Sequence, residues 1–148
     1  MIVTMDLIGV TAEIRAHVAT EVERRFGLKA HELLLNASHT HSGPQVAPDR
    51  MLLERNFRRA AKAEDIAAVQ AYHARLKQEL VDIVGESLRE TLPARVEFAQ
   101  ARAGFAMNRR RPEANGTLTN NPHPAGPIDH DVPVLKVSGE DGKIRALV

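Results

Sequence analysis

The 148-residue chain contains no cysteine and no tryptophan, and it has only one tyrosine and four phenylalanines. Without cysteine there is no disulfide, no thiolate nucleophile and no cysteine-based zinc site, so a metal needs histidine, carboxylate or tyrosine ligands. The scarcity of aromatic rings removes the stacking platforms that bind single-stranded nucleic acid. An excess of one charge is also lacking. Twenty basic and nineteen acidic residues leave a formal net charge of +1, which argues against a nucleic-acid partner.

Long apolar runs are missing as well. No stretch of the sequence approaches the ~20 apolar residues needed to cross a bilayer. Residues 1–8 lack the basic stretch and the long apolar core of a secretory signal, and the compartment stays open. With 43% hydrophobic residues the chain can bury one core, so we expect a single domain over residues 1–148. Because the chain ends within the strand expected at residues 144–148, we expect this domain to be a fragment truncated at its C-terminal end.

The first forty residues predict the βαβ start of an α/β fold. Residues 2–8 predict a strand, and Thr11 is a suitable N-cap for the helix that follows, which Gly27 can end. Apolar residues recur at every fourth position of this helix: Ile14, Val18, Val22 and Phe26. The apolar run at residues 33–35 predicts a second strand covered on both faces. A parallel pair of strands joined by the helix is therefore expected.

Further along, the pattern predicts a mixed sheet with flanking helices, as in part of a larger layered α/β domain. The expected elements are a partly helical excursion (45–62), a long helix (65–90), a strand (95–101), a short strand (104–108), a long loop (110–131) and an antiparallel pair (132–137 with 144–148). Loops of such length inside a compact domain are usually functional or disordered.

Two histidines mark the exit of the second expected strand. His39 and His41 are two residues apart, and in an extended backbone their side chains would point to the same face. Ligands of α/β sheets gather at this carboxyl end of the strands. Imidazole is a common zinc ligand, and a catalytic zinc usually keeps three protein ligands and a water whose pKa falls to about 7. The bare pattern is weakly specific, and two loop histidines bonded to the backbone are the competing interpretation. Asp6, at the end of the first strand, is a candidate for orienting a metal-bound histidine.

The whole string around these histidines is more specific. Asn-Ala-Ser-His-Thr-His-Ser-Gly-Pro at residues 36–44 closely resembles the Thr-His-Thr-His-Ser-Gly-Pro signature of neutral, non-lysosomal ceramidases. Ser38 replaces the first threonine of that signature, and Gln45-Val46 stand where Gly-Gly often follows. Asn108-Arg109 is similar to an Asn-Arg pair further along in the family. Gly-Pro-Ile-Asp at residues 126–129, followed by the strand at 132–137, resembles the Asp-containing loop and strand that come next.

The resemblance implies a zinc-dependent hydrolase of sphingolipid metabolism that cleaves the N-acyl amide bond of ceramide-like lipids. It implies that His39 is a zinc ligand, that His41 binds or polarises the substrate amide, and that Arg109 adds positive charge. It further implies one Zn²⁺ whose remaining ligands follow Val148, so the isolated chain is expected to be inactive. The lipid substrate implies access to a membrane surface, and members of the family are often secreted or periplasmic. His123 and His130 do not match the context of the missing ligand and are interpreted as surface residues.

A different class of function stays open from the residues alone. The chain would then be a noncatalytic α/β binding or interaction module with structural histidines, and the loop at residues 110–131 would contact a partner. The three consecutive arginines from Arg109 to Arg111 would form an ordinary solvated turn. The oligomeric state does not follow from the sequence under either interpretation.

Overall fold

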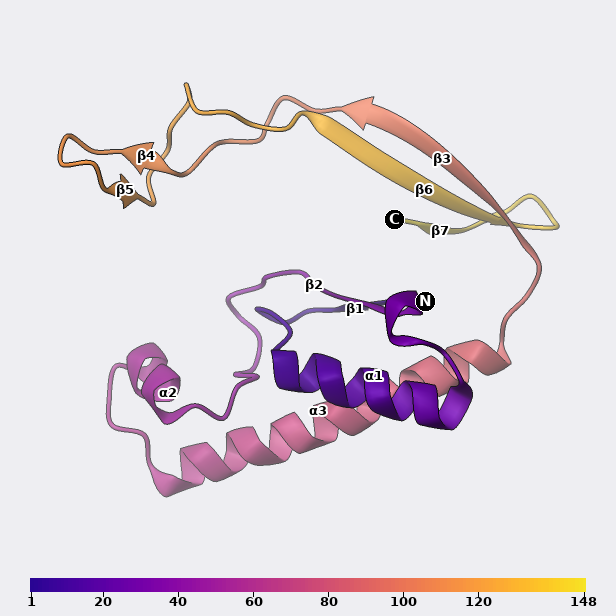
Figure 1. Cartoon of the computed structure of the whole chain (residues 1–148), viewed down its shortest axis with the longest axis horizontal. Coiled ribbons are helices and arrows are strands. Elements are labelled where there is room, and N and C mark those ends of the chain that lie inside the picture. The colour runs from indigo at the N-terminus through magenta and orange to yellow at the C-terminus, as the bar shows by residue number, and fades with distance from the viewer. The chain divides into compact units, whose positions relative to one another are not determined.

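The computed structural model describes residues 1–148, apart from the side chains of Arg50 and Phe57. Its elements, in chain order, are β1 (Ile2–Met5), α1 (Ala12–Phe26), the 3₁₀ helix η1 (Ala30–Glu32), β2 (Leu34–Ala37), α2 (Arg50–Phe57), α3 (Ala63–Arg89), β3 (Ala94–Arg102), β4 (Arg111–Pro112), β5 (Leu118–Thr119), β6 (Asp131–Gly139) and β7 (Ile144–Leu147) (Figure 1). Helices combine with parallel and antiparallel strands, so the α/β class is confirmed. The chain divides into two compact units, Met1–Thr91 and Leu92–Val148, and each is described by itself. The single truncated catalytic domain stays a prediction.

The first unit contains the predicted βαβ start. Strands β1 and β2 pair in parallel, with Ile2 opposite Leu34 at one end and Met5 opposite Ala37 at the other. Helices α1 and α3 lie on one side of this pair (Figure 1). Leu34 is 56% exposed, so the prediction that the second strand is covered on both faces is wrong. The reason is that both helices pack on the same face and leave the other face of the pair open.

Helix α1 has the ends that its sequence predicts. The Thr11 hydroxyl accepts a hydrogen bond from the backbone N–H of Ile14 at 3.2 Å, which satisfies one of the unpaired donors of the first turn. Gly27 adopts the left-handed conformation with φ of 77°, and its N–H bonds to the carbonyl of Glu23 at 2.9 Å. A residue with a side chain is strained in this conformation, so glycine ends the helix at little cost.

Removing the N-cap is expected to destabilise the first unit. Thr11→Ala leaves the Ile14 N–H without its side-chain acceptor and should lower the free energy of unfolding by about 1 kcal/mol. Urea denaturation followed by circular dichroism measures the change. Thr20→Ala is the matched control because Thr20 is exposed within α1, where alanine is the better helix former. Equal destabilisation by both substitutions would contradict the capping role.

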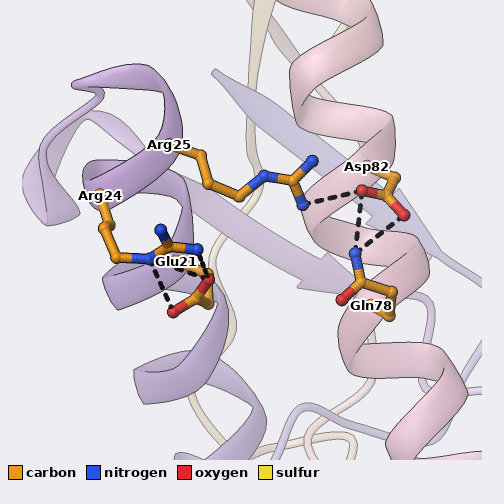
Figure 2. Close-up of polar contacts among 5 residues, drawn as sticks. All are labelled: Glu21, Arg24, Arg25, Gln78 and Asp82. Atoms are coloured by element: carbon orange, nitrogen blue, oxygen red, sulfur yellow. Dashed lines mark hydrogen bonds and ion pairs between the residues drawn. The ribbon is translucent and has the colours of Figure 1, made fainter.

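The packing of α1 against α3 forms the core of the first unit. Its buried side chains are Val3, Leu7, Ile14, Val18, Val22, Leu33, Val46, Leu76, Leu80, Val81 and Val84. Figure 2 shows the polar rim of this interface, where Asp82 of α3 accepts from Gln78 and from Arg25 of α1, each at 2.9 Å. These two hydrogen bonds, that of Gln78 first, lower the pKa of Asp82. Exposed ion pairs contribute little to stability, so the apolar contacts carry most of the stabilisation.

The second unit is built on an antiparallel sheet in the order β3-β6-β7. Strands β3 and β6 pair from Ala94 opposite Gly139 to Arg102 opposite Asp131. A turn with Gly142 at φ of 74° leads into β7, as the sequence predicts. Strands β4 and β5 form a small ribbon inside the long loop. The short strand expected at residues 104–108 is not formed, because this segment has no ladder partner and instead anchors the loop through Asn108.

No helix within the described part of the chain is both long enough and apolar enough to span a membrane.

Candidate functional site

The histidine motif leaves the carboxyl end of the parallel pair, as predicted. Strand β2 ends at Ala37, and the backbone N–H of Ser38 then bonds to the carbonyl of Met5, the last residue of β1, at 3.0 Å. The loop at residues 38–44 therefore begins where both strands end. This is the edge of an α/β sheet at which ligands usually bind.

The backbone at His39 differs from the extended form expected. His39 has φ of 61°, in the left-handed region that residues with a side chain rarely adopt. The chain therefore turns sharply directly after β2, and the prediction of an extended backbone that points both side chains to the same face is wrong. Such strained residues cost on the order of 1–3 kcal/mol and cluster at functional sites.

The turn nevertheless brings the two imidazole rings together. The ring centroids of His39 and His41 lie 5.0 Å apart, with an angle of 81° between the ring planes. Both residues are exposed. Two imidazoles at this separation can contact one small ligand. The sequence predicted their proximity from an extended backbone, whereas in the structure a turn at His39 brings the rings together.

A hydrogen bond fixes the ring of His39. Its Nδ1 lies 2.7 Å from the carbonyl oxygen of Ile8. Because a carbonyl oxygen only accepts, Nδ1 carries the proton, and the Nε2 of a neutral ring keeps its lone pair. Metal-binding histidines are commonly oriented by such a bond from the second ring nitrogen. The orienting acceptor is therefore the backbone of Ile8 rather than the carboxylate of Asp6 that the sequence singled out.

Gly43 allows the motif loop to approach the segment after β1. A Cβ atom at this position would lie 3.0 Å from the backbone oxygen of Asp6 and 3.3 Å from the side-chain methyl of Thr40. The first of these neighbours is backbone and cannot easily move away. Together with the bonds to Met5 and Ile8, this close contact holds the loop against the end of β1.

A methyl group at Gly43 is expected to loosen this contact. Gly43→Ala should displace the loop by a few tenths of an ångström, weaken the bond from His39 to Ile8, and destabilise the first unit by about 1 kcal/mol. The Nδ1–H proton resonance of His39 and the urea midpoint report the two effects. Gly9→Ala is the control, since a Cβ there meets nothing within 4 Å. An unchanged His39 resonance in Gly43→Ala would refute the expectation.

Arg109 belongs to the second unit, whereas His39 and His41, whose rings lie close together, belong to the first. Arg109 is exposed, and its Nε–H donates to the side-chain oxygen of Asn120 at 3.1 Å. Its neighbour Arg111 forms an ion pair with Glu113 at 3.0 Å. Within residues 109–111, Arg111 is therefore paired with a carboxylate, and Arg109 is held by an amide.

The two further histidines of interest lie in the long loop of the second unit, and both are half-buried. His130 donates from Nδ1 to the carbonyl of Ala103 at 3.0 Å, next to the backbone bond from Ala103 to His130 at 2.9 Å. The backbone carbonyl of His123 accepts a hydrogen bond from the backbone N–H of Gly126. Their contacts close turns of the loop.

No three His, Asp or Glu side chains gather into a metal-binding group among the residues described. Comparison of the chain with models of protein families, with curated proteins and with solved structures finds no match. Sequence reasoning missed the Ile8 carbonyl and Asn120, because neither carries a motif; only the fold brings them to His39 and Arg109.

Proposed function

We propose that the chain supplies part of the active site of a zinc-dependent amide hydrolase of the neutral ceramidase type. The reaction would cleave the N-acyl amide bond of a ceramide-like lipid into a sphingoid base and a fatty acid. The single observation that best supports the proposal is the 2.7 Å bond from Nδ1 of His39 to Ile8, which leaves Nε2 as a ligand atom. Amide hydrolysis is the reaction proposed because the motif at residues 38–44 resembles that of neutral ceramidases.

Of the described residues, the proposal assigns only His39 to the metal. His39 would hold zinc through Nε2, and the fixed tautomer lowers the cost of binding because the ring needs no reorientation. Bound zinc supplies a Lewis acid and a nucleophile that is available at neutral pH. In the proposal, His41 donates a hydrogen bond to the amide carbonyl and orients it. In the proposal, the guanidinium of Arg109 supplies positive charge where the oxyanion develops.

The proposal places the remaining zinc ligands after Val148. The test therefore uses a version of the protein that continues past this residue. Metal analysis should find one zinc per chain, and a short-chain fluorogenic ceramide should be hydrolysed. A chelator should remove both the zinc and the activity, and added zinc should restore the activity. Full activity in a metal-free preparation would reject the proposal.

A second candidate is the noncatalytic interaction module, and exposed apolar residues on β3 favour it. Val96 is 60% exposed and Phe98 is 69% exposed. They occupy alternate positions of the strand and therefore share one face of the sheet. Such a surface is typical of a protein-binding site. Zinc-independent binding of a partner by a protein that hydrolyses no amide would favour this function over the first.

A further inference from the structure

Asn108 uses both ends of its side chain to close the long loop of the second unit. Its Nδ2 donates to the carbonyl of Pro127 at 2.7 Å, and its Oδ1 accepts from the backbone N–H of Arg110 at 2.9 Å. Its own carbonyl accepts from the backbone N–H of His123 at 2.8 Å. One half-buried residue therefore ties the segment before the loop's ribbon to the segment after it.

The turn held by Asn108 is packed closely against it. Gly126 is buried, and its N–H bonds to the carbonyl of His123 at 2.9 Å. A Cβ at Gly126 would lie 2.8 Å from Cγ of Asn108 and 2.7 Å from Nδ1 of His123. This position therefore accommodates only glycine unless both neighbouring side chains move.

The residue directly after Asn108 is Arg109, whose guanidinium is held by a second amide. Its Nε–H donates to Oδ1 of Asn120, which belongs to the loop that Asn108 closes. Within the described part of the chain no carboxylate pairs with Arg109. The terminal amino groups of its guanidinium therefore remain available to a ligand. A planar cation without an acidic partner can bind an oxyanion through parallel hydrogen bonds.

We infer that Asn108 is a positioning residue that fixes the backbone at Arg109 and so presents its guanidinium to a bound oxyanion. The inference rests on the proposed function for the identity of that oxyanion. Asn108 acts on both sides of Arg109: its backbone immediately precedes the arginine, and its Oδ1 holds the N–H of Arg110. Preorganised charge stabilises a transition state more than mobile charge, because no reorganisation is needed during the reaction.

The variant Asn108→Asp tests the role of the Nδ2 donor of Asn108. It keeps the size of the side chain and an oxygen for the N–H of Arg110, but it sets a carboxylate against the Pro127 carbonyl. Asn121→Ala is the matched control, because Asn121 lies in the same loop and its Nδ2 bonds only within the ribbon, to Thr119 at 3.1 Å. Hydrogen exchange of the Arg109 Nε–H is measured by NMR in the full chain, and Arg109→Lys identifies the signal. Steady-state kinetics with the fluorogenic ceramide are measured in the extended protein.

We expect Asn108→Asp to speed exchange of the Arg109 Nε–H by about fivefold. The substitution removes the bond from Asn108 to Pro127, worth about 1 kcal/mol, and so loosens the loop in which Asn120 holds Arg109. In the same variant kcat and kcat/KM should fall together by about tenfold or more, as for an interaction made in the transition state. Asn121→Ala should change neither quantity. A loss of protein stability alone would not produce this combination, since folded enzyme would keep its kcat.

Unchanged exchange in Asn108→Asp would overturn the inference, whatever the activity. Full kcat in Asn108→Asp together with a large loss in Arg109→Ala would also overturn it, while the proposed function would stand. If the wild-type extended protein hydrolysed no amide, the proposed function would fail. The exchange experiment would then still decide whether Asn108 fixes Arg109.

Discussion

Replacing His39 by alanine is expected to remove zinc from the extended protein and to lower kcat for amide hydrolysis by about a thousandfold or more. The substitution deletes a ligand whose ring the Ile8 carbonyl already orients at 2.7 Å. A Lewis-acidic metal contributes several kcal/mol to an acyl-transfer transition state, and about 1.4 kcal/mol corresponds to a tenfold rate. Metal analysis and single-turnover kinetics on the same preparation measure both effects.

Two other histidine substitutions separate metal binding from substrate binding. His41→Ala should retain zinc and lower kcat by about a hundredfold, the typical effect of losing one donor to an oxyanion. His31→Ala, an exposed histidine on η1, should change neither quantity. Retention of zinc and of hydrolysis in His39→Ala would show that the motif is not a metal site. Loss of zinc in both His39→Ala and His41→Ala would instead make His41 a ligand.

The helices that the sequence predicted correctly are set by local interactions. The start of α1 depends on Thr11 and Ile14, three residues apart, and its end depends on the left-handed Gly27. The long helix α3 follows from its apolar spacing alone. Such features need no knowledge of distant residues, because the hydrogen bonds and the buried stripe lie within one helix.

The geometry of the candidate site could not be read from the sequence for the opposite reason. The acceptor for His39 is the carbonyl of Ile8, 31 positions earlier, and any residue type presents the same carbonyl. The left-handed turn at His39 is imposed where the loop meets the end of β1, although an extended backbone is the usual choice for histidine. Sequence reasoning therefore found the two rings but not the turn that joins them.

The same distinction applies to the second unit. Asn108-Arg109 and the segment at residues 126–129 were identified as separate points of resemblance. In the structure, the bond from Asn108 to Pro127 connects them across 19 positions. The expected strand at residues 104–108 failed because alternation of residue types gives no information about whether a partner strand is present. Pairing is a property of the sheet, and here β6 pairs with β3 and β7.

Gly85→Ala is expected to destabilise the first unit by about 2 kcal/mol, although alanine is normally favoured over glycine in a helix by about 1 kcal/mol. Gly85 is buried on α3, and a Cβ there would clash with Cζ of Phe26 at the end of α1. The ring is partly buried and carries the Arg25 guanidinium 5.0 Å from its centroid, so it cannot move without loss of contacts. Urea denaturation measures the change in the free energy of unfolding.

The effect of Gly85→Ala on stability should change sign when Phe26 is also replaced by alanine. In Phe26→Ala the atoms that clash with the new methyl are gone, so Gly85→Ala should then stabilise α3 by about 1 kcal/mol through helix propensity alone. Glu86→Ala, at the exposed neighbouring position, should have a similar small effect in both backgrounds. A destabilisation of equal size with and without the Phe26 ring would mean that another contact limits the space at Gly85. The reversal would establish that α1 and α3 approach each other as closely as they do because residue 85 has no side chain.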